Sequence, residues 1–232
     1  MNVTAILPLP ADLGPRPEAV FMPVAGMSPL SRILEGLRPC AEVVVVTAWE
    51  LMPSVRAALP DRAGEIAAGQ GFSLKLVAAE PAAGRAQCVA AALAEIDPDA
   101  PVLLHDIEWP VVPPTLVDRI SDALTEGASA AWPTLPVTDS VKAVDAAGSV
   151  TATVDRAMLR SVQYPRGYAA GTLTTLLAED TDGTFDDLAL TLSAGLRPTL
   201  VEGDAEAVTV ELPRDSGYLS AVLQSAQNPP GR

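Results

Sequence analysis

The sequence predicts an α/β fold: a Rossmann-like, mostly parallel sheet with helices on both faces. Three observations lead to this prediction. Apolar β-type runs alternate with helical patterns through the first 135 residues, as in a βαβα chain. The run EVVVVT at Glu42–Thr47 does not alternate with polar residues, which is typical of a strand covered on both faces. The segment Ser28–Leu37 begins with a serine cap and a proline, a favourable helix start.

Each remaining element of the first half follows from its own pattern. The predicted strands, in order, are Val3–Leu7, Glu42–Thr47, Ser73–Ala78, Pro101–His105 and Ala128–Leu135. The predicted helices are Ser28–Leu37, the alanine-rich Ala83–Ile96 and the amphipathic Pro113–Leu124. Ligands bind such sheets beyond the carboxyl ends of the strands, so the candidate segments follow Leu7, Ala78 and His105.

The second half of the chain has a different pattern. Two short β runs, Val141–Asp145 and Ser149–Thr153, flank an Ala-Ala-Gly turn and predict a β-hairpin arm that projects from the sheet. Beyond it we expect helices at Tyr168–Leu177 and Thr184–Ala194, strands at Thr199–Val201 and Val208–Glu211, and a last helix from Asp215. The expected organisation is one domain over residues 1–226, an arm at about 138–156 and a flexible tail at 227–232.

Composition limits the possible partners. The net charge of −14 argues against nucleic acid and anionic membranes, and any anionic ligand needs a local cluster of positive charge. No apolar run approaches the roughly 20 residues needed to span a bilayer. The first basic residue is Arg16, so a secretory signal is not expected. Cys40 and Cys88 lack metal or redox spacing, and we expect reduced thiols in a cytoplasmic protein.

Four segments, in order along the chain, give it a specific resemblance. They are LLHDIEWP (Leu103–Pro110), PVTDSVKAVDAAG (Pro136–Gly148), TVDRAMLRSVQYPRGY (Thr153–Tyr168) and TLVEGDAEAVTV (Thr199–Val210). Together they resemble the 2-C-methyl-D-erythritol 4-phosphate cytidylyltransferase family of nucleotidyltransferases, from Val3 to about Leu223. The resemblance implies cytidylyl transfer from CTP to a polyol phosphate with Mg²⁺, release of pyrophosphate in the non-mevalonate isoprenoid route, and a homodimer that swaps its arms.

The first loop departs from the family pattern. The family's Ala-Ala-Gly turn is matched by Leu9, Pro10 and Ala11, and proline has no N–H to donate to a phosphate. The family's Pro-Lys pair ends in Glu18 here, so a positive charge aimed at the triphosphate becomes negative. The loop arginine of the family has no clear counterpart, and Arg16 lies nearby but out of register.

Part of the nucleotide pocket is retained. The resemblance matches Arg85 to the arginine of a Gly-Gly-x-x-Arg motif, and matches Cys88 to a small hydroxyl residue that contacts the cytosine. It gives Asp106 the position of the Mg²⁺-binding carboxylate, the one metal ligand expected if the protein is active. A helix-surface position for Arg85 and turn capping by Asp106 are the structural alternatives. His105, the only histidine, is expected to be structural.

Of the residues that the resemblance assigns to the substrate pocket, those in the arm are retained and the others are altered. Ile107 and Glu108 replace two alanines of the family, which crowds the site and adds a negative charge. Trp109 replaces an arginine that helps bind the substrate phosphate and cannot make its charged fork. The remaining positions of the substrate pocket are the retained Asp139, Ser140, Lys142 and Arg156, and the substituted Phe185 and Thr209.

These losses of positive charge leave three hypotheses. The first is a catalytically degenerate paralogue with weak or absent CTP binding, which acts by binding or through a homodimer or a mixed dimer with an intact paralogue. The second is an active cytidylyltransferase whose charge comes from Arg16, Arg85, Lys142 and Arg156. The third is an enzyme or binder for a less anionic ligand, with Trp109, Tyr164 and Phe185 lining one pocket.

Overall fold

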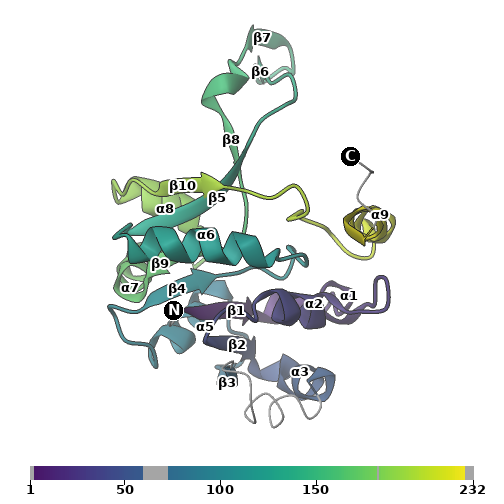
Figure 1. The fold of residues 1–232 in the computed structure, drawn as a ribbon, viewed down its shortest axis with the longest axis vertical. Coiled ribbons are helices and arrows are strands. Elements are labelled where there is room, and N and C mark those ends of the chain that lie inside the picture. Colours follow the sequence, from purple (N-terminus) through teal and green to yellow (C-terminus); the bar gives the residue numbers. More distant parts are fainter. Residues whose placement is uncertain (1–2, 60–72, 182, 228–232) are drawn as a thin grey trace.

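The computed structural model describes residues 3–59, 73–181 and 183–227, and a single large sheet organises them. Within the described residues this sheet has eight strands in the order β10–β5–β9–β4–β1–β2–β3, with β8 beside β5 (Figure 1). Its parallel part comprises β1 (Thr4–Leu9), β2 (Glu42–Ala48), β3 (Ser73–Ala79) and β4 (Pro101–Leu104). The predicted fold class and the first four strands are therefore confirmed.

The other half of the sheet is mixed. Strand β10 (Thr199–Glu202) runs parallel to β5 (Ala130–Pro136). Strand β9 (Arg166–Ala169) is antiparallel to both β4 and β5, and β8 (Arg160–Val162) is antiparallel to β5. These two short strands were not predicted.

Helices cover both faces of the sheet (Figure 1). One face packs against α2 (Pro29–Gly36), α3 (Met52–Ala58) and α6 (Pro114–Thr125). The other packs against α5 (Arg85–Leu93), α7 (Ala170–Glu179) and α8 (Asp187–Ser193). Leu7 belongs to the first core cluster and Ile6 to the second, which explains why β1 is apolar from Ala5 to Leu9. The Ser28 hydroxyl accepts the Ser31 N–H at 3.2 Å and caps α2 as predicted.

The arm is a separate two-stranded sheet of β6 (Lys142–Val144) and β7 (Val150–Thr153), so the predicted hairpin is confirmed. It projects from the body at the top of Figure 1. Its turn is stabilised by Asp145, whose side chain accepts the N–H groups of Ala147 and Ser149, both at 2.9 Å. Gly148 takes the positive φ of 81° that closes this turn.

The C-terminal segment differs in part from its prediction. Helix α9 (Ser216–Gln227) is present, but Val208–Glu211 pairs with no strand of the described part of the chain, so that predicted strand is wrong. The N–H of Val210 instead donates to the Glu108 carbonyl at 2.8 Å. Residues 228–232 of the expected tail lie outside the described residues, and the single-domain boundary at 226 stays a prediction.

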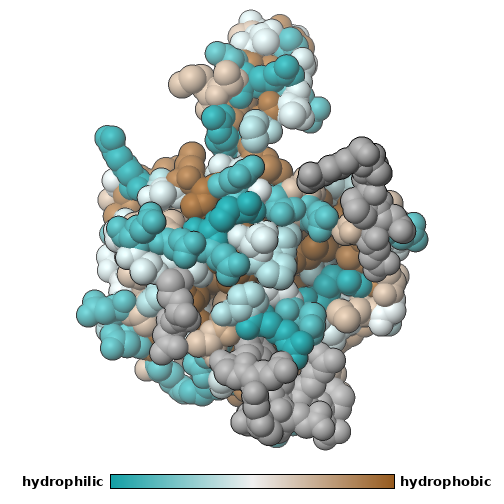
Figure 2. Space-filling model, viewed as in Figure 1, coloured by the Kyte–Doolittle hydropathy of each residue, from teal (hydrophilic) through white to brown (hydrophobic). Residues whose placement is uncertain are grey.

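The surface of the described part of the chain has both hydrophilic and apolar residues. Figure 2 shows hydrophilic residues spread over the drawn face of the body, with apolar residues scattered among them. No helix in residues 3–59, 73–181 or 183–227 combines the length and the apolar character needed to cross a membrane.

Candidate functional site

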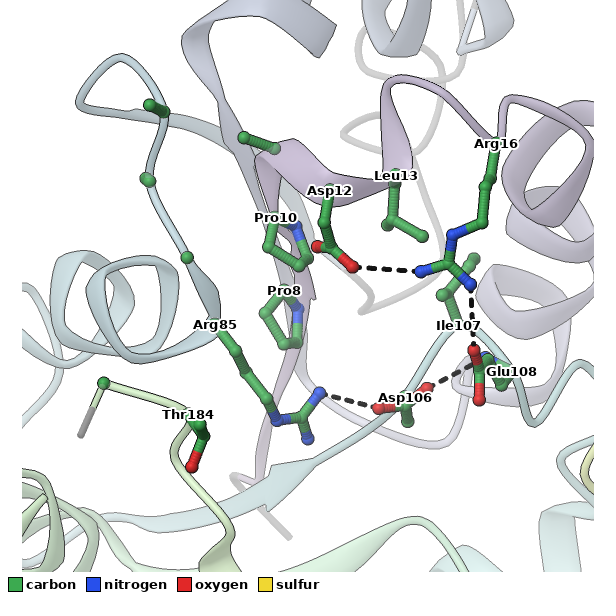
Figure 3. Close-up of a pocket in the computed structure, with 15 residues that line it drawn as sticks. Pro8, Pro10, Asp12, Leu13, Arg16, Arg85, Asp106, Ile107, Glu108 and Thr184 are labelled. Carbon is green, nitrogen blue, oxygen red and sulfur yellow. Dashed lines mark hydrogen bonds and ion pairs between the residues drawn. The ribbon is translucent and has the colours of Figure 1, made fainter.

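A cavity of about 450 Å³ opens beyond the carboxyl ends of β1, β3 and β4, at the edge of the sheet that the sequence predicted (Figure 3). Three segments supply most of its wall: the loop after β1, the start of α5 and the loop after β4. The lining residues that carry charge are Asp12, Arg16, Arg85, Asp106 and Glu108.

Several backbone donors of the loop after β1 are already bonded within the protein. Pro10 has no N–H, and the N–H of Ala11 donates to the Ala83 carbonyl at 2.9 Å. The N–H groups of Leu13 and Gly14 donate to the carbonyls of Pro10 and Ala11, at 3.1 and 3.0 Å. A phosphate-binding loop points such groups at its ligand, and here these donors are already bonded within the protein.

Arg16 is the basic residue that this loop brings to the cavity. Its guanidinium contacts Asp12 at 2.9 Å and Glu108 at 3.5 Å, so two carboxylates flank one cation (Figure 3). Glu18, the first residue of α1 (Glu18–Phe21), is exposed and lies outside the cavity lining. The acidic charges that face the cavity are therefore those of Asp12, Asp106 and Glu108.

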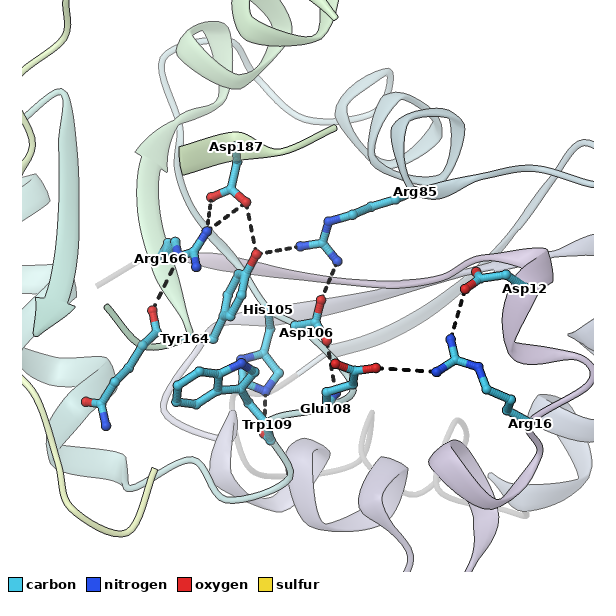
Figure 4. Close-up of polar contacts among 11 residues, drawn as sticks. Asp12, Arg16, Arg85, His105, Asp106, Glu108, Trp109, Tyr164, Arg166 and Asp187 are labelled. Atoms are coloured by element: carbon cyan, nitrogen blue, oxygen red, sulfur yellow. Dashed lines mark hydrogen bonds and ion pairs between the residues drawn. The ribbon is translucent and has the colours of Figure 1, made fainter. Parts of the chain in front are cut away.

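Arg85 and Asp106 form a second ion pair at the base of the cavity. The Arg85 Nη1 lies 2.7 Å from Asp106 Oδ2, and Nη2 donates to the Tyr164 hydroxyl at 3.0 Å (Figure 4). Burial lowers the pKa of Arg85, but the Tyr164 hydroxyl and the carboxylates of Asp106 and Asp187 raise it overall. Asp106 Oδ1 also accepts the N–H of Glu108 at 2.9 Å, so it caps the turn as its structural alternative predicted.

Asp106, the expected Mg²⁺ ligand, already has hydrogen-bond partners within the protein. The two carboxylate oxygens of Asp106 are engaged by Arg85 and by the Glu108 N–H. Among the described residues, no group of three or more His, Cys, Asp or Glu side chains could hold a metal ion. Mg²⁺ at Asp106 stays a prediction, because one or two carboxylates together with substrate phosphates commonly hold this ion.

A buried polar network lies behind the cavity and was not predicted. Asp187 is its centre: both of its oxygens lie 2.9 Å from Nη1 of Arg166, a buried ion pair (Figure 4). The hydroxyls of Tyr164 and Tyr168 donate to the same carboxylate at 2.9 and 2.8 Å. Trp132 in turn donates to the Tyr168 hydroxyl at 3.0 Å. Because Tyr164 also accepts from the cavity arginine, the network connects the core to the site.

His105 has the structural role that was expected. It is fully buried, and its Nε2 lies 2.9 Å from the Trp109 carbonyl, to which it donates. Burial is the main cause that lowers the pKa of His105 to about 4, so the ring is neutral at neutral pH.

The pKa of His105 predicts a loss of stability in mild acid. Its folded pKa of about 4 lies below the usual 6.5, so the unfolded chain binds the proton first. We expect this group to lower the free energy of unfolding by about 1–2 kcal/mol as the pH falls from 6.5 to about 5. The His105→Gln variant should lose this contribution in urea denaturation at several pH values. Identical pH slopes for the two proteins would contradict the prediction.

The aromatic residues of the third hypothesis do not line this cavity. Trp109 and Tyr164 contact edge to face, with ring centroids 6.1 Å apart, and Tyr164 is 8% exposed. Phe185 is buried in the core cluster beside α5 and α7. Cys88 and Leu9 are likewise core residues, and burial raises the pKa of the Cys88 thiol to about 11. None of these five belongs to the lining of the cavity.

The remaining predicted site residues lie outside the lining of the cavity within one chain. Lys142 lies on the arm and donates to the Thr153 hydroxyl at 2.8 Å, and Arg156 donates to the Thr138 carbonyl near the arm's base. Thr209 is exposed beside the C-terminal core cluster. Asp139 and Ser140 are exposed at the start of the arm. The structure therefore joins Pro10, Ala11, Arg85 and Asp106 in one cavity and leaves the arm residues outside it.

Comparison with known proteins gives one family for both sequence and fold. The model of the 2-C-methyl-D-erythritol 4-phosphate cytidylyltransferase family matches residues 19–225. The chain is 36% identical to a protein of that description from Saccharopolyspora erythraea, over 96% of this chain and all of that protein. It is 33% identical to one from Rhodococcus jostii, over 90% of this chain and 88% of that protein.

Solved structures agree with the sequence comparison. The enzyme of the same description from Thermus thermophilus matches with a TM-score of 0.71 and 29% identity, over 97% of this chain and all of that one. The 4-diphosphocytidyl-2C-methyl-D-erythritol synthase of Anaerococcus prevotii matches in fold with a TM-score of 0.76 at 18% identity, over 96% of this chain and 98% of that one. This chain belongs to the 2-C-methyl-D-erythritol 4-phosphate cytidylyltransferase family.

Proposed function

We propose that this family member keeps the scaffold without the transfer reaction, and acts by binding a ligand in the cavity or through a dimer. One observation carries the proposal: each arginine that lines the cavity is already paired with carboxylates. Asp12, Asp106 and Glu108 outnumber Arg16 and Arg85 by one, so the charged lining residues sum to −1.

Cytidylyl transfer requires cations and N–H donors that are free to contact phosphate groups, whereas the cations and several N–H donors of this cavity are paired. A phosphate oxygen attacks the α-phosphate of CTP, and the transition state must be neutralised by cations and N–H donors aimed at it. Here Arg85 would have to leave Asp106, and Arg16 would have to leave Asp12 and Glu108. The N–H of Ala11 would also have to leave its carbonyl partner. Each rearrangement opposes binding of a triphosphate.

A direct assay tests the loss of the reaction. With CTP, Mg²⁺ and 2-C-methyl-D-erythritol 4-phosphate, we expect pyrophosphate release far below the ~1 s⁻¹ of a typical enzyme. The Thermus thermophilus relative, assayed in parallel, controls for the reagents. A kcat above about 1 s⁻¹ for this chain would show that the proposal is wrong.

An active cytidylyltransferase is the second candidate. The presence of Arg85 and Asp106 in the cavity lining favours it, since the resemblance assigns both positions to the nucleotide site. Lys142 and Arg156 would then reach the cavity of a second copy from its swapped arm. Under this alternative, CTP with Mg²⁺ should raise the melting temperature.

The same proposal includes the oligomeric state of the protein and its location in the cell. The arm exposes apolar side chains, with Val144 60% and Val150 65% exposed, which suits contact with a second copy or with an intact paralogue. Cys40 and Cys88 are both free and buried, which suits a reducing cytoplasm. The mass of the protein in solution distinguishes a dimer from a monomer.

A further inference from the structure

A chain of charges crosses the cavity from one loop to another (Figure 3). Asp12 and Arg16 come from the loop after β1, and Glu108 comes from the loop after β4. The Arg16 Nη2 lies 2.9 Å from Asp12 Oδ2, and its Nη1 lies 3.5 Å from Glu108 Oε1. Glu108 therefore occupies a donor of the cation that would otherwise face an anionic ligand.

The backbone on both sides of Glu108 is fixed. Its N–H donates to Asp106 at 2.9 Å, and its carbonyl accepts the N–H of Val210 at 2.8 Å. The side chain is therefore carried into the cavity by a held segment rather than by a free loop. Burial raises the pKa of Glu108, and the nearby charge of Asp106 raises it further.

We propose that Glu108 is a specificity-determining residue, whose carboxylate excludes polyphosphates from the cavity. With Glu108 ionised, the charged lining residues sum to −1, and without its charge they sum to zero. Loss of that charge also frees the Nη1 of Arg16 for an anion. The proposal rests on the proposed loss of the transfer reaction, for which it supplies a cause.

Two features of this arrangement make the effect of the Glu108 charge on ligand affinity measurable. The side chains of Arg16 and Glu108 are each 43% exposed, so their attraction is weak and a single anion could compete for the cation. Repulsion between the carboxylate and a ligand of several negative charges remains after the ion pair opens, and salt screens it. The expected exclusion is therefore largest for polyphosphates at low ionic strength.

Inorganic tripolyphosphate, titrated by calorimetry without divalent cations, tests the proposal. The Glu108→Gln variant keeps the size of the side chain and should bind this probe at least about tenfold more tightly than the wild type. Adding Arg16→Gln to that variant should reduce the gain, because the freed guanidinium causes much of it. Raising the salt concentration should narrow the difference between Glu108→Gln and the wild type.

The Glu126→Gln variant is the matched control. It makes the same change in net charge at an exposed position at the C-terminus of α6, outside the cavity lining. Its affinity should stay within about twofold of the wild type, a difference of well under 1.4 kcal/mol. Equal gains in both variants, or no gain in Glu108→Gln, would overturn the proposal.

The proposed function and this inference fail by different results. Rapid pyrophosphate release by the wild type would contradict the loss of the reaction, whatever the affinity of Glu108→Gln for tripolyphosphate. An unchanged affinity in Glu108→Gln would remove the role of Glu108 and leave the activity result standing.

Discussion

Replacing Asp187 with alanine is expected to lower the free energy of unfolding by about 3–5 kcal/mol. Asp187 is 1% exposed and its partner Arg166 is 6% exposed, so the substitution leaves a desolvated guanidinium without its counterion. The hydroxyls of Tyr164 and Tyr168 lose their acceptor in the same step.

Urea denaturation measures this loss against a matched acid. Asp122, exposed on α6, changes in the same way when replaced by alanine, and its effect should stay within about 0.5 kcal/mol. Replacing Arg166 with Met and Asp187 with Leu together should cost less than Asp187→Ala alone, because no charge is left buried. An Asp187→Ala variant within about 1 kcal/mol of the wild type would contradict this account of the network.

The network gives a physical reason for the orientation of Tyr164 and Arg166. Both side chains turn to Asp187 rather than to the cavity. The Arg166 guanidinium also lies 3.9 Å from the centroid of the Tyr164 ring. The two residues therefore form an internal cluster with satisfied polar groups, which orients Arg85 through the Tyr164 hydroxyl.

The predictability of the fold depended on the strength of the local pattern. Unbroken apolar strands such as β2 and a capped helix such as α2 carry their own signals, and both were found close to their observed bounds. Strand β9 was missed because it has four residues and includes a buried arginine and Gly167. A Cβ at Gly167 would lie 2.5 Å from Ile120 of α6, a close approach visible only in three dimensions. The residues Val208, Thr209 and Val210 are β-branched, yet among the described residues they pair with no strand.

The location of the site was predictable from the sequence, but the ion pairs within it were not. Topology alone placed the cavity beyond β1 and β4, because the carboxyl ends of parallel strands meet at one edge. The contact of Arg16 with Glu108 joins residues 92 positions apart, and no local pattern indicates it. Sequence also could not distinguish Phe185 as a pocket wall from Phe185 as a core residue, because both environments favour aromatic side chains.

Replacing Gly36 with alanine should lower the free energy of unfolding by about 2–3 kcal/mol, although alanine is the better helix former. Gly36 ends α2, and a Cβ there would lie 2.4 Å from the Val112 carbonyl oxygen and 2.6 Å from the Val112 Cβ. Both atoms are fixed to the backbone, so no rotamer change relieves the clash. Helix α2 must therefore move away from Val112, which lies three residues after Trp109 on the segment that leads away from the cavity.

The same substitution at Gly217 should have the opposite sign. Gly217 lies near the start of α9, and a Cβ there would meet nothing within 4 Å, so alanine should stabilise by up to about 1 kcal/mol. Chemical denaturation of the two variants therefore separates helix propensity, which both share, from the clash, which only Gly36 has. Because Val112 continues the segment that carries Asp106 and Glu108, Gly36→Ala should also disturb the cavity, whereas Gly217→Ala should not. A Gly36→Ala variant as stable as the wild type would mean that α2 is free to shift, and that this segment does not hold the loop after β4 in place.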